Sequence, residues 1–198
     1  MSAISHQLSA KAKQKEKTMR ITTGKYRNRK LHIPRGIRPT QDKVRKAVFD
    51  IMGDISGLRF LELYAGSGAV GFEALSRGAA ELTLVESNRD SVLAIRRNIE
   101  LLNAAECRLY HLEAEKAVKL LSLDKKEFDI IFIDPPYNKG LGKKILQTLE
   151  GYDILAHYGL VLVQHSRLEQ LECGCLKLDL IKEAKYGDTW LSIFRKKG

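Results

Sequence analysis

The stretch that most constrains the fold of this chain is an apolar, strand-like run at residues 128–133 that ends in Asp134, Pro135, Pro136 and Tyr137. A parallel strand that is buried on both faces reads as a continuous run of β-branched and aromatic residues, and this run has that composition. The two prolines fix φ and remove two backbone N–H donors, so the strand cannot continue past them. Open α/β sheets bind ligands at the carboxyl ends of their strands. The corner therefore predicts a site that offers acceptors and an aromatic face to a planar amine, although a plain strand end with a Pro-Pro turn is the simpler alternative.

Strand-like and helix-like segments alternate up to residue 164, and this order favours a parallel sheet. The expected helices cover residues 41–52, 69–77, 89–102, 114–123 and 141–155. The expected parallel strands cover residues 58–64, 82–85, 107–111, 128–133 and 159–164. Two further strands, 176–181 and 189–194, have no helix between them, so they must pair as an antiparallel hairpin. The predicted fold is a Rossmann-like α/β domain whose seven-stranded mixed sheet has five parallel strands, a C-terminal antiparallel hairpin and helices on both faces.

The formal net charge of +10 is concentrated in the N-terminal quarter of the 198 residues. Residues 1–50 contain 14 Lys and Arg against 3 Asp and Glu, whereas residues 51–198 contain 20 against 21. This distribution is typical of a polyanion-binding segment on a nearly neutral body. The predicted organisation is a basic disordered extension (1–18), a small basic hairpin and loop (19–40) and one α/β domain (41–198). A solubilising tail is the alternative for the extension.

The expected hairpin has strands at 20–23 and 30–33. Its Arg27, Arg29 and Lys30 combine with Tyr26 to interleave charge with an aromatic ring, as contacts to phosphates and bases require. On the first expected helix, Arg45 and its neighbouring lysines fit RNA contact and a solvated helix face equally well. The candidate RNA-binding residues are Arg20, Lys25, Arg27, Arg29, Lys30 and Arg38.

Composition excludes several classes of protein. No apolar run approaches the roughly 20 residues of a membrane-spanning helix, and the N-terminus lacks the apolar region of a signal peptide. The three cysteines form neither an even disulfide framework nor a spaced set of zinc ligands. We therefore expect a cytoplasmic protein with reduced thiols, no metal site and no membrane partner, and we take a monomer as the working state.

Residues 60–71 read as a strand, a glycine loop and the start of a helix. The spacing Gly66-x-Gly68-x-x-Gly71 matches the dinucleotide-binding fingerprint, although a glycine turn for close helix packing also explains the glycines. Glu62 discriminates between ligands, because a carboxylate at this strand end would repel a pyrophosphate. S-adenosylmethionine instead offers an ammonium to acidic groups, a carboxylate to helix N–H groups and a positively charged sulfonium. Glu62 therefore favours this methyl donor over NAD.

Two further acids follow the next strands. Glu86 ends the second strand, where a carboxylate can accept both ribose hydroxyls. Glu113 follows the third strand and is placed to accept from an adenine amino group, with Ala114 against the ring and Glu115 as a competing acid. The predicted cofactor-binding residues are Glu62, Tyr64, Ala65, Gly66, Ser67, Gly68, Gly71, Glu86, Ser87, Glu113 and Ala114.

The order of these acids and glycines, followed by the Asp-Pro-Pro-Tyr corner, resembles class I S-adenosylmethionine-dependent methyltransferases that methylate amino groups. More narrowly, the chain resembles the RsmD-type family of bacterial 16S ribosomal RNA guanine-N2 methyltransferases from about Met19 to the C-terminus. The segments that carry this resemblance are Arg20-Ile21, Gly24-Lys25-Tyr26, Arg38-Pro39-Thr40 with Asp42, Val44, Arg45 and Phe49, Leu63 to Gly68, and Tyr186-Gly187-Asp188-Thr189. The chain departs from the family at Asn28, usually glycine, and at Glu113, usually aspartate.

This resemblance implies methylation of a guanine N2 amine in small-subunit ribosomal RNA or its assembling particle, with S-adenosylmethionine as cofactor. The implied catalytic residues are Asp134 and the Pro135 carbonyl as acceptors for the amine, Pro136 to fix the corner, and Tyr137 to stack the base. An N6-adenine methyltransferase acting on RNA or DNA would share this corner but usually has a larger target-recognition region. A protein-glutamine methyltransferase would typically carry Asn at position 134. A non-catalytic RNA-binding module would leave the glycine loop and the corner unused.

Overall fold

The computed structural model describes residues 18–34, 36, 42–137, 139–171, 174 and 177–197. The predicted disordered extension, apart from Thr18, and the candidate cation Arg38 lie outside these ranges. Within them, no helix is long and apolar enough to cross a membrane.

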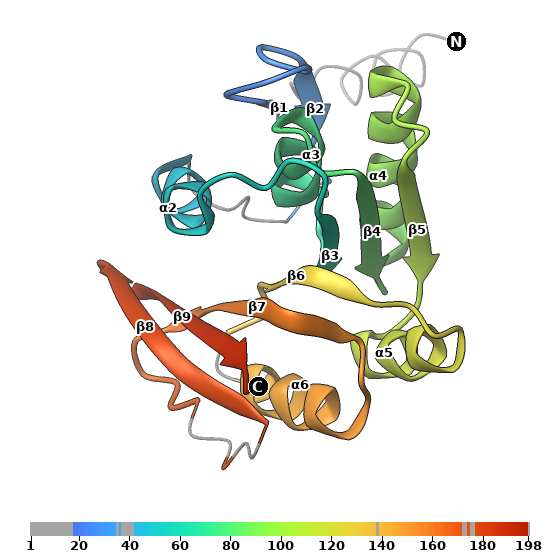
Figure 1. Cartoon of the computed structure of the whole chain (residues 1–198). Helices are drawn as coiled ribbons and strands as arrows, with labels where there is room; N and C mark the ends of the chain where they lie inside the picture. Colours follow the sequence, from blue (N-terminus) through green and yellow to red (C-terminus); the bar gives the residue numbers. More distant parts are fainter. Residues whose placement is uncertain are drawn as a thin grey trace, which may run out of the picture.

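The central element is a seven-stranded sheet in the order β5-β4-β3-β6-β7-β9-β8 (Figure 1). Its strands are β3 (Arg59–Leu63), β4 (Glu81–Glu86), β5 (Cys107–His111), β6 (Phe128–Ile133), β7 (Leu155–Ser166), β8 (Leu178–Tyr186) and β9 (Thr189–Lys196). The strands β3 to β7 pair in parallel, whereas β9 runs antiparallel to both β7 and β8. The predicted fold class is confirmed, because five parallel strands are extended by a C-terminal antiparallel hairpin.

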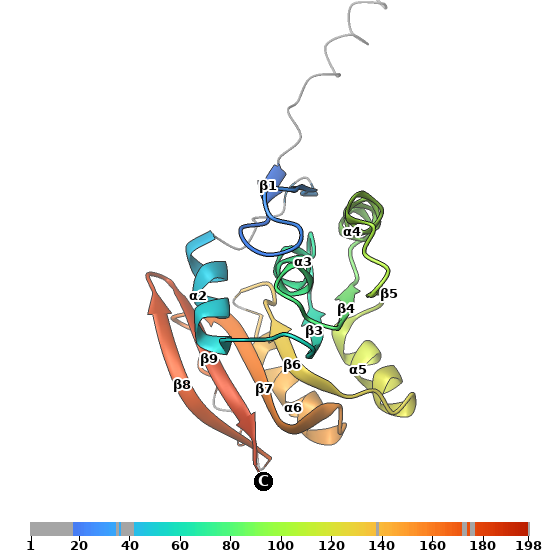
Figure 2. The ribbon, with the colours of Figure 1, turned by 45° about the horizontal axis from the view of Figure 1, so that its top comes forward.

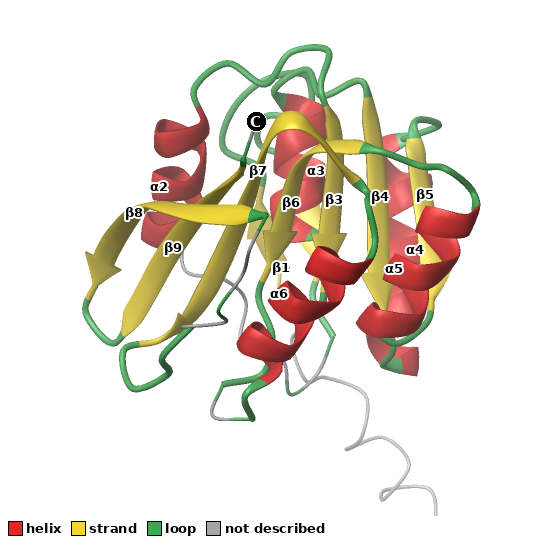
Figure 3. Cartoon of the chain, turned by 60° about the horizontal axis from the view of Figure 1, so that its bottom comes forward, coloured by secondary structure: helices red, strands yellow, loops and turns green. Residues whose placement is uncertain are grey.

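Helices cover both faces of this sheet (Figure 3). They are α2 (Asp42–Met52), α3 (Ala69–Ser76), α4 (Arg89–Leu102), α5 (Ala114–Leu123) and α6 (Leu141–Gly151). On one face, α2, α3 and α4 bury Val48, Phe72 and Ile95 in a shared core cluster. On the other face, α5 and α6 bury Val118 and Ile145 in a second cluster. The two clusters hold the strands between them, so the carboxyl ends of the parallel strands form one edge of the sheet.

The helix expected over residues 141–155 ends earlier, at Gly151, so that part of the prediction was wrong. Leu155 already belongs to β7, where it pairs with Phe128. The ladder then shifts register, and Tyr158 has a φ of 61°, which interrupts the regular strand before it pairs again with β6. Apolar residues at the end of a helix and at the start of a buried strand look alike, so periodicity alone did not locate this boundary.

The basic hairpin is present as a two-stranded sheet of β1 (Thr18–Arg20) and β2 (Lys30–His32). Its first strand lies earlier than the predicted 20–23, and Thr22 bonds elsewhere: its N–H and its hydroxyl donate to the Glu73 carboxylate at 2.8 and 2.6 Å. Tyr26, expected among the RNA contacts, is only 6 % exposed and packs in the core cluster with α3 and α4. The hairpin is therefore a packed part of the body and not a free arm (Figure 2).

Two more buried side chains hold this hairpin against the helices. The Ser76 hydroxyl on α3 accepts from the backbone N–H of Tyr26 at 2.8 Å. The Asn98 side chain on α4 accepts from the N–H of His32 at 2.8 Å and donates to the carbonyls of His32 and Ser67 at 3.0 and 3.1 Å. Asn98 thus joins β2 directly to the glycine loop.

Arg45 on α2 is 2 % exposed, so both sequence interpretations of this cation, RNA contact and solvated helix face, were wrong. Its guanidinium donates to the Arg20 carbonyl at 2.9 Å and lies 3.8 Å from the buried Glu73 carboxylate. Buried charges need such partners, and each of these two has one more: Arg45 lies 3.0 Å from the Asp42 carboxylate, and Glu73 lies 3.2 Å from the Arg77 guanidinium. Arg45 and Glu73 therefore fasten β1 to α2 and α3.

Candidate active site

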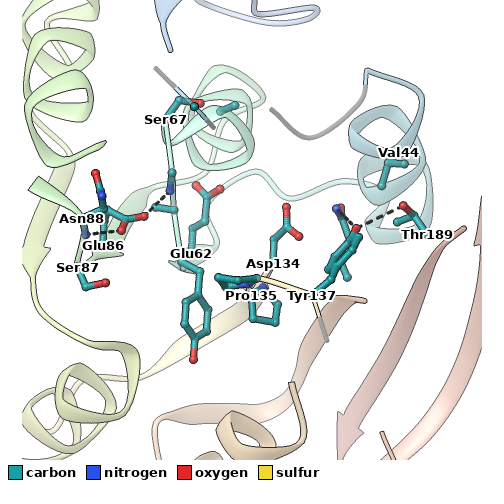
Figure 4. Close-up of a pocket in the computed structure, with 17 residues that line it drawn as sticks. Val44, Glu62, Ser67, Glu86, Ser87, Asn88, Asp134, Pro135, Tyr137 and Thr189 are labelled. Carbon is teal, nitrogen blue, oxygen red and sulfur yellow. Dashed lines mark hydrogen bonds between the residues drawn. The ribbon is translucent and has the colours of Figure 1, made fainter. Parts of the chain in front are cut away.

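A cavity of about 540 Å³ opens at the carboxyl ends of β3, β4, β6 and β7 (Figure 4). This volume suits a small ligand, and the strand order reverses at the same place, because β3 lies between β4 and β6. The described residues that line the cavity are Gly36, Val44, Glu62, Tyr64, Ala65, Gly66, Ser67, Ala69, Glu86, Ser87, Asn88, Asp134, Pro135, Pro136, Tyr137, Gln164 and Thr189. We call Glu62, residues 64–67, Ala69 and residues 86–88 the glycine-loop half, and Val44, residues 134–137, Gln164 and Thr189 the tyrosine half.

Strand periodicity brings the polar side chains of the cavity to one face of the sheet. Glu62 on β3 pairs in register with Phe132 on β6, so Asp134 follows two residues later on the same face. Glu86 lies two residues past the β4 partner of Glu62, and Gln164 lies two residues past the β7 partner of Phe132. All four side chains therefore leave the sheet on the face covered by α2, α3 and α4.

Glu62 is 4 % exposed, and its carboxylate accepts from the N–H of Gly71 at 2.8 Å. This N–H belongs to the first turn of α3, so Glu62 caps that helix from inside the protein. Burial raises the pKa of the Glu62 carboxyl to about 8, and the carboxylates of Asp134 and Glu86 contribute to the rise. Ionised Glu62 is consequently stabilised by a cation in the cavity.

The three glycines of the motif have separate roles, and only Gly66 lines the cavity. Gly66 and Gly68 have φ of 57° and 72°, in the left-handed region that favours glycine. A Cβ on Gly71 would lie 2.6 Å from the Leu82 side chain and 2.8 Å from the Glu62 carboxylate. The first two glycines therefore shape the turn, and the third lets α3 pack closely on the sheet.

Glu86 joins the two loops of the glycine-loop half. One carboxylate oxygen accepts from the N–H of Gly66 and the other from the N–H of Asn88, each at 2.7 Å. Each oxygen retains acceptor capacity for a further donor. Asn88 in turn caps α4, because its side-chain oxygen accepts from the N–H groups of Asp90 and Ser91 at 3.0 and 3.1 Å.

The tyrosine half is built around the hydroxyl of Tyr137. This hydroxyl lies 3.1 Å from the Gln164 amide nitrogen, which donates to it, and 3.3 Å from the Thr189 hydroxyl. Figure 4 shows the Tyr137 ring between Asp134 and Thr189, with the Asp134 and Glu62 carboxylates pointing into the same space. Three segments far apart in sequence therefore hold one aromatic ring beside Asp134.

Charge limits what this cavity can bind. The carboxylates of Glu62, Glu86 and Asp134 line it, and no Lys or Arg does so among the residues described. A pyrophosphate would meet acidic side chains and no cation, whereas an ammonium, a sulfonium and ribose hydroxyls would each meet acceptors. The residues present therefore fit S-adenosylmethionine and do not fit a dinucleotide.

Four of the predicted cofactor residues do not line the cavity: Gly68 and Gly71, whose roles are given above, and Glu113 and Ala114. The Glu113 side chain is largely exposed and pairs with Lys116 at 3.0 Å. Ala114 is buried in the core cluster beneath α5. A role for either residue at the adenine remains a prediction from the sequence.

The hairpin cations also lie away from the cavity. Arg29 donates to the Leu101 carbonyl at 2.7 Å, near the C-terminal end of α4, whereas Asn88 lines the cavity at the other end of the same helix. Arg20 and Lys25 bond or pair within the protein, to the Asn28 carbonyl at 2.9 Å and the Glu106 carboxylate at 3.8 Å. Arg27 and Lys30 are exposed and make no ion pair or side-chain hydrogen bond with any other described residue.

The sequence interpretation missed several cavity residues. Gln164 was expected at the end of its strand without a role, although its position matches that of Asp134 on the neighbouring strand. Thr189 lies in a segment that carried the family resemblance, and Asn88 stood next to two predicted residues. Val44 also lies in a segment that carried the family resemblance, whereas Gly36 and Ala69 gave no signal.

Comparison with known proteins places the chain in a family. Over residues 19–195 it matches the family described as Conserved hypothetical protein 95. It is 32 % identical over 184 residues to putative rRNA methyltransferase YlbH of Bacillus subtilis, covering 91 % of this chain and 100 % of that protein. It is 36 % identical over 149 residues to ribosomal RNA small subunit methyltransferase D of Escherichia coli strain K12, covering 74 % of each. The chain belongs to the RsmD family of methyltransferases.

Solved structures agree with this assignment. Putative methyltransferase yhhF from Escherichia coli superposes with a TM-score of 0.78 at 30 % identity, covering 92 % of this chain and 99 % of that one. More distant methyltransferases, some with S-adenosylmethionine or its demethylated product bound, share the RsmD-family fold at 18–22 % identity and TM-scores of 0.63–0.70. Across the described ranges of the chain, no group of three or more His, Cys, Asp or Glu is placed to hold a metal ion.

Proposed function

We propose that this RsmD-family protein transfers a methyl group from S-adenosylmethionine to the exocyclic N2 amine of a guanine in small-subunit ribosomal RNA. The observation that carries the proposal is the meeting, in one cavity, of a carboxylate-lined glycine loop and the Asp-Pro-Pro-Tyr corner. The names of the relatives, which describe ribosomal RNA methyltransferases, support an RNA substrate. We further propose that the protein acts as a cytoplasmic monomer on this RNA or on its assembling particle.

The glycine-loop half would bind the methyl donor, which supplies a methyl group on a positively charged sulfonium. Glu62 accepts from its ammonium, and Glu86 accepts from its ribose hydroxyls with the acceptor capacity left beyond Gly66 and Asn88. The carboxylates attract the cationic donor more strongly than its neutral product. This difference favours release of the product after transfer.

The tyrosine half would hold the base. The guanine N2 lone pair is delocalised into the ring, so this nitrogen is a weak nucleophile. The Asp134 carboxylate and the Pro135 carbonyl both accept from the amino group, which favours a pyramidal nitrogen with its lone pair directed at the methyl group. The Tyr137 ring stacks on the base, a contact worth about 1–3 kcal/mol in single-strand binding.

Positioning is the larger catalytic contribution. Aligned reactants reach effective molarities of about 10⁵ M or more. The base must leave any helical stack to enter the cavity, so an unpaired or loosely paired guanine costs least to bind. Asp134 need not act as a strong base, because the methylated ammonium is acidic and loses its proton to water. Exposed Arg27 and Lys30 would contact RNA phosphates, which position the substrate without reading its sequence.

The test is transfer of tritium from labelled S-adenosylmethionine. The acceptors are small-subunit particles and naked RNA from cells that lack this protein, with DNA alongside, and the labelled nucleoside is identified after digestion. Label in N2-methylguanosine from small-subunit RNA is the expected result. Label in N6-methyladenine would keep the donor site but overturn the substrate, and donor-independent RNA binding without transfer would favour a binding module.

A further inference from the structure

The tyrosine half contains a buried acceptor without a partner. Gln164 is 5 % exposed and lines the cavity. Its side-chain nitrogen donates to the Tyr137 hydroxyl at 3.1 Å, and its Oε1 has no hydrogen-bond partner in the described part of the protein. Buried polar atoms are nearly always paired in folded proteins, so an unpaired acceptor in a cavity wall marks a place for a donor from the ligand.

The position of this acceptor relative to Asp134 is fixed by the sheet. Ile133 on β6 pairs in register with Val163 on β7, so Asp134 and Gln164 are the next residues along two neighbouring strands. Such strands lie about 4.8 Å apart, and side chains at matching positions leave the sheet on the same face. A base whose amino group reaches Asp134 can therefore present a ring atom beside that amino group to Gln164.

The contact between the Gln164 side-chain nitrogen and Tyr137 orients the Gln164 amide. The Gln164 nitrogen is occupied by the Tyr137 hydroxyl, whose own hydrogen can go to the Thr189 hydroxyl at 3.3 Å. One N–H of Gln164 is thereby used by Tyr137, and Oε1 is the buried atom of Gln164 that lacks a partner in the described part of the protein. This group accepts hydrogen bonds and does not donate them.

We infer that Gln164 determines base specificity by accepting a hydrogen bond from the N1–H of guanine while Asp134 holds the N2 amine. This inference rests on the proposed function and names what selects its substrate. Guanine has two ring nitrogens beside its amino group, of which N1 carries a hydrogen and N3 a lone pair, and N1 is the one placed at Oε1. In adenine and cytosine, the ring nitrogen beside the amino group carries a lone pair, which would face Oε1 and leave two buried acceptors unpaired. The same cavity would therefore reject both bases as acceptors of the methyl group.

The experiment compares two RNAs that differ only at the methylated nucleotide located by the labelling experiment, with guanine in one and 2-aminopurine in the other. 2-Aminopurine keeps the amine on C2 but has no hydrogen on N1. For the wild-type protein, kcat/KM should favour guanine by about tenfold or more, as expected for loss of one buried hydrogen bond. Gln164→Leu keeps the volume of the side chain and removes the acceptor, so its preference for guanine should fall about tenfold relative to wild type.

Two variants separate base recognition from support of Tyr137. Thr189→Val removes the other partner of the Tyr137 hydroxyl but keeps the Gln164 acceptor, so its preference for guanine should match that of wild type. Gln164→Glu keeps an acceptor and should also preserve the preference. Equal loss of preference in Thr189→Val and Gln164→Leu, or wild-type preference in Gln164→Leu, would overturn the inference.

The wild-type protein alone tests the function on which the inference depends. Absence of N2-methylguanosine from the guanine RNA would overturn the proposed function and the inference together. Methylation of the guanine RNA by wild type, with an unchanged preference in Gln164→Leu, would overturn only the role of Gln164. Melting temperatures of the variants, followed by circular dichroism, confirm that each is folded before its kinetics are compared.

Discussion

In the glycine-loop half of the cavity, Glu62 and Glu86 bond to main-chain N–H groups, whereas in the tyrosine half Tyr137 bonds to the side chains of Gln164 and Thr189. The first arrangement is local, since its residues all lie between positions 62 and 88. The second gathers residues from the end of β6, the end of β7 and the start of β9. Changes in the glycine-loop half should therefore alter the shape of the loop as well as the ligand contact, whereas changes in the tyrosine half should act mainly on the base.

The largest expected effect is in the tyrosine half. Asp134→Ala should lower kcat about 10²- to 10³-fold, because it removes one of the two acceptors that align the amine. The dissociation constant of S-adenosylmethionine, measured by calorimetry, should change by no more than about threefold. Asp134→Asn serves as the control that keeps the shape and one acceptor. Near-wild-type turnover in Asp134→Ala would contradict the proposed contact with the amine.

Glu86→Ala tests the other half. It should weaken S-adenosylmethionine binding about 10- to 100-fold, because a charge-assisted contact is lost and the N–H groups of Gly66 and Asn88 lose their acceptor. RNA affinity should be unchanged. Glu81→Ala, an exposed glutamate at the opposite end of β4, is the matched control. If donor affinity were unchanged in Glu86→Ala, the ribose assignment would be wrong.

A pH dependence should distinguish the halves further. The raised pKa of Glu62, about 8, means that its carboxyl is mostly protonated at pH 7 and becomes ionised as the pH rises through 8. Binding of a donor ammonium favours the ionised form, so donor affinity should increase by up to about tenfold per pH unit below 8, with release of close to one proton at pH 7. Calorimetry in two buffers of different ionisation enthalpy counts that proton.

Glu62→Gln is the control, since it can still accept from Gly71 but has no proton to release. Unchanged proton release in this variant would show that another group titrates. The same raised pKa affects stability without ligand. The folded state binds this proton more tightly than the unfolded state, so the contribution of Glu62 is fully present below its ordinary pKa of 4.5 and is lost as the pH rises towards about 8.

The smallest expected effect is that of Tyr137→Phe. This change keeps the stacking ring and removes the hydroxyl, so kcat/KM should fall only about two- to tenfold. Tyr137→Ala should be more damaging, because it also removes the stacking contact of about 1–3 kcal/mol. Equal losses in the two variants would mean that the hydroxyl, and not the ring, carries the function of Tyr137.

The contrast between the halves also explains what the sequence could reveal. Glu62, the glycines and Glu86 were predicted because each follows a clear strand and the glycine spacing is a known pattern. The alternation of strands and helices predicted the sheet for a similar reason. Gln164 and Thr189 were missed because they join the site only when β7 and β9 pair beside β6, and no local pattern encodes that approach.

The errors at the basic hairpin have a different cause. Composition shows that residues are charged or aromatic but not which of them the fold buries. Arg45 and Tyr26 looked like parts of an RNA-binding surface, yet both are buried because α2 and α3 provide Glu73 and an apolar surface close to the hairpin. The buried partner of Arg45, Glu73, is 28 residues away, and a short window along the chain does not contain both.

Helix α4 carries a consequence for the kind of RNA that suits this protein. Its 14 residues correspond to a length of about 21 Å, with Asn88 in the cavity wall at one end and Leu101 against Arg29 at the other. In the proposed complex, a nucleic acid that enters the cavity beside Asn88 and also reaches Arg29 has to extend along this helix. A short oligonucleotide would engage one end of this helix only. The tertiary shape of a larger RNA would therefore be part of what the protein recognises.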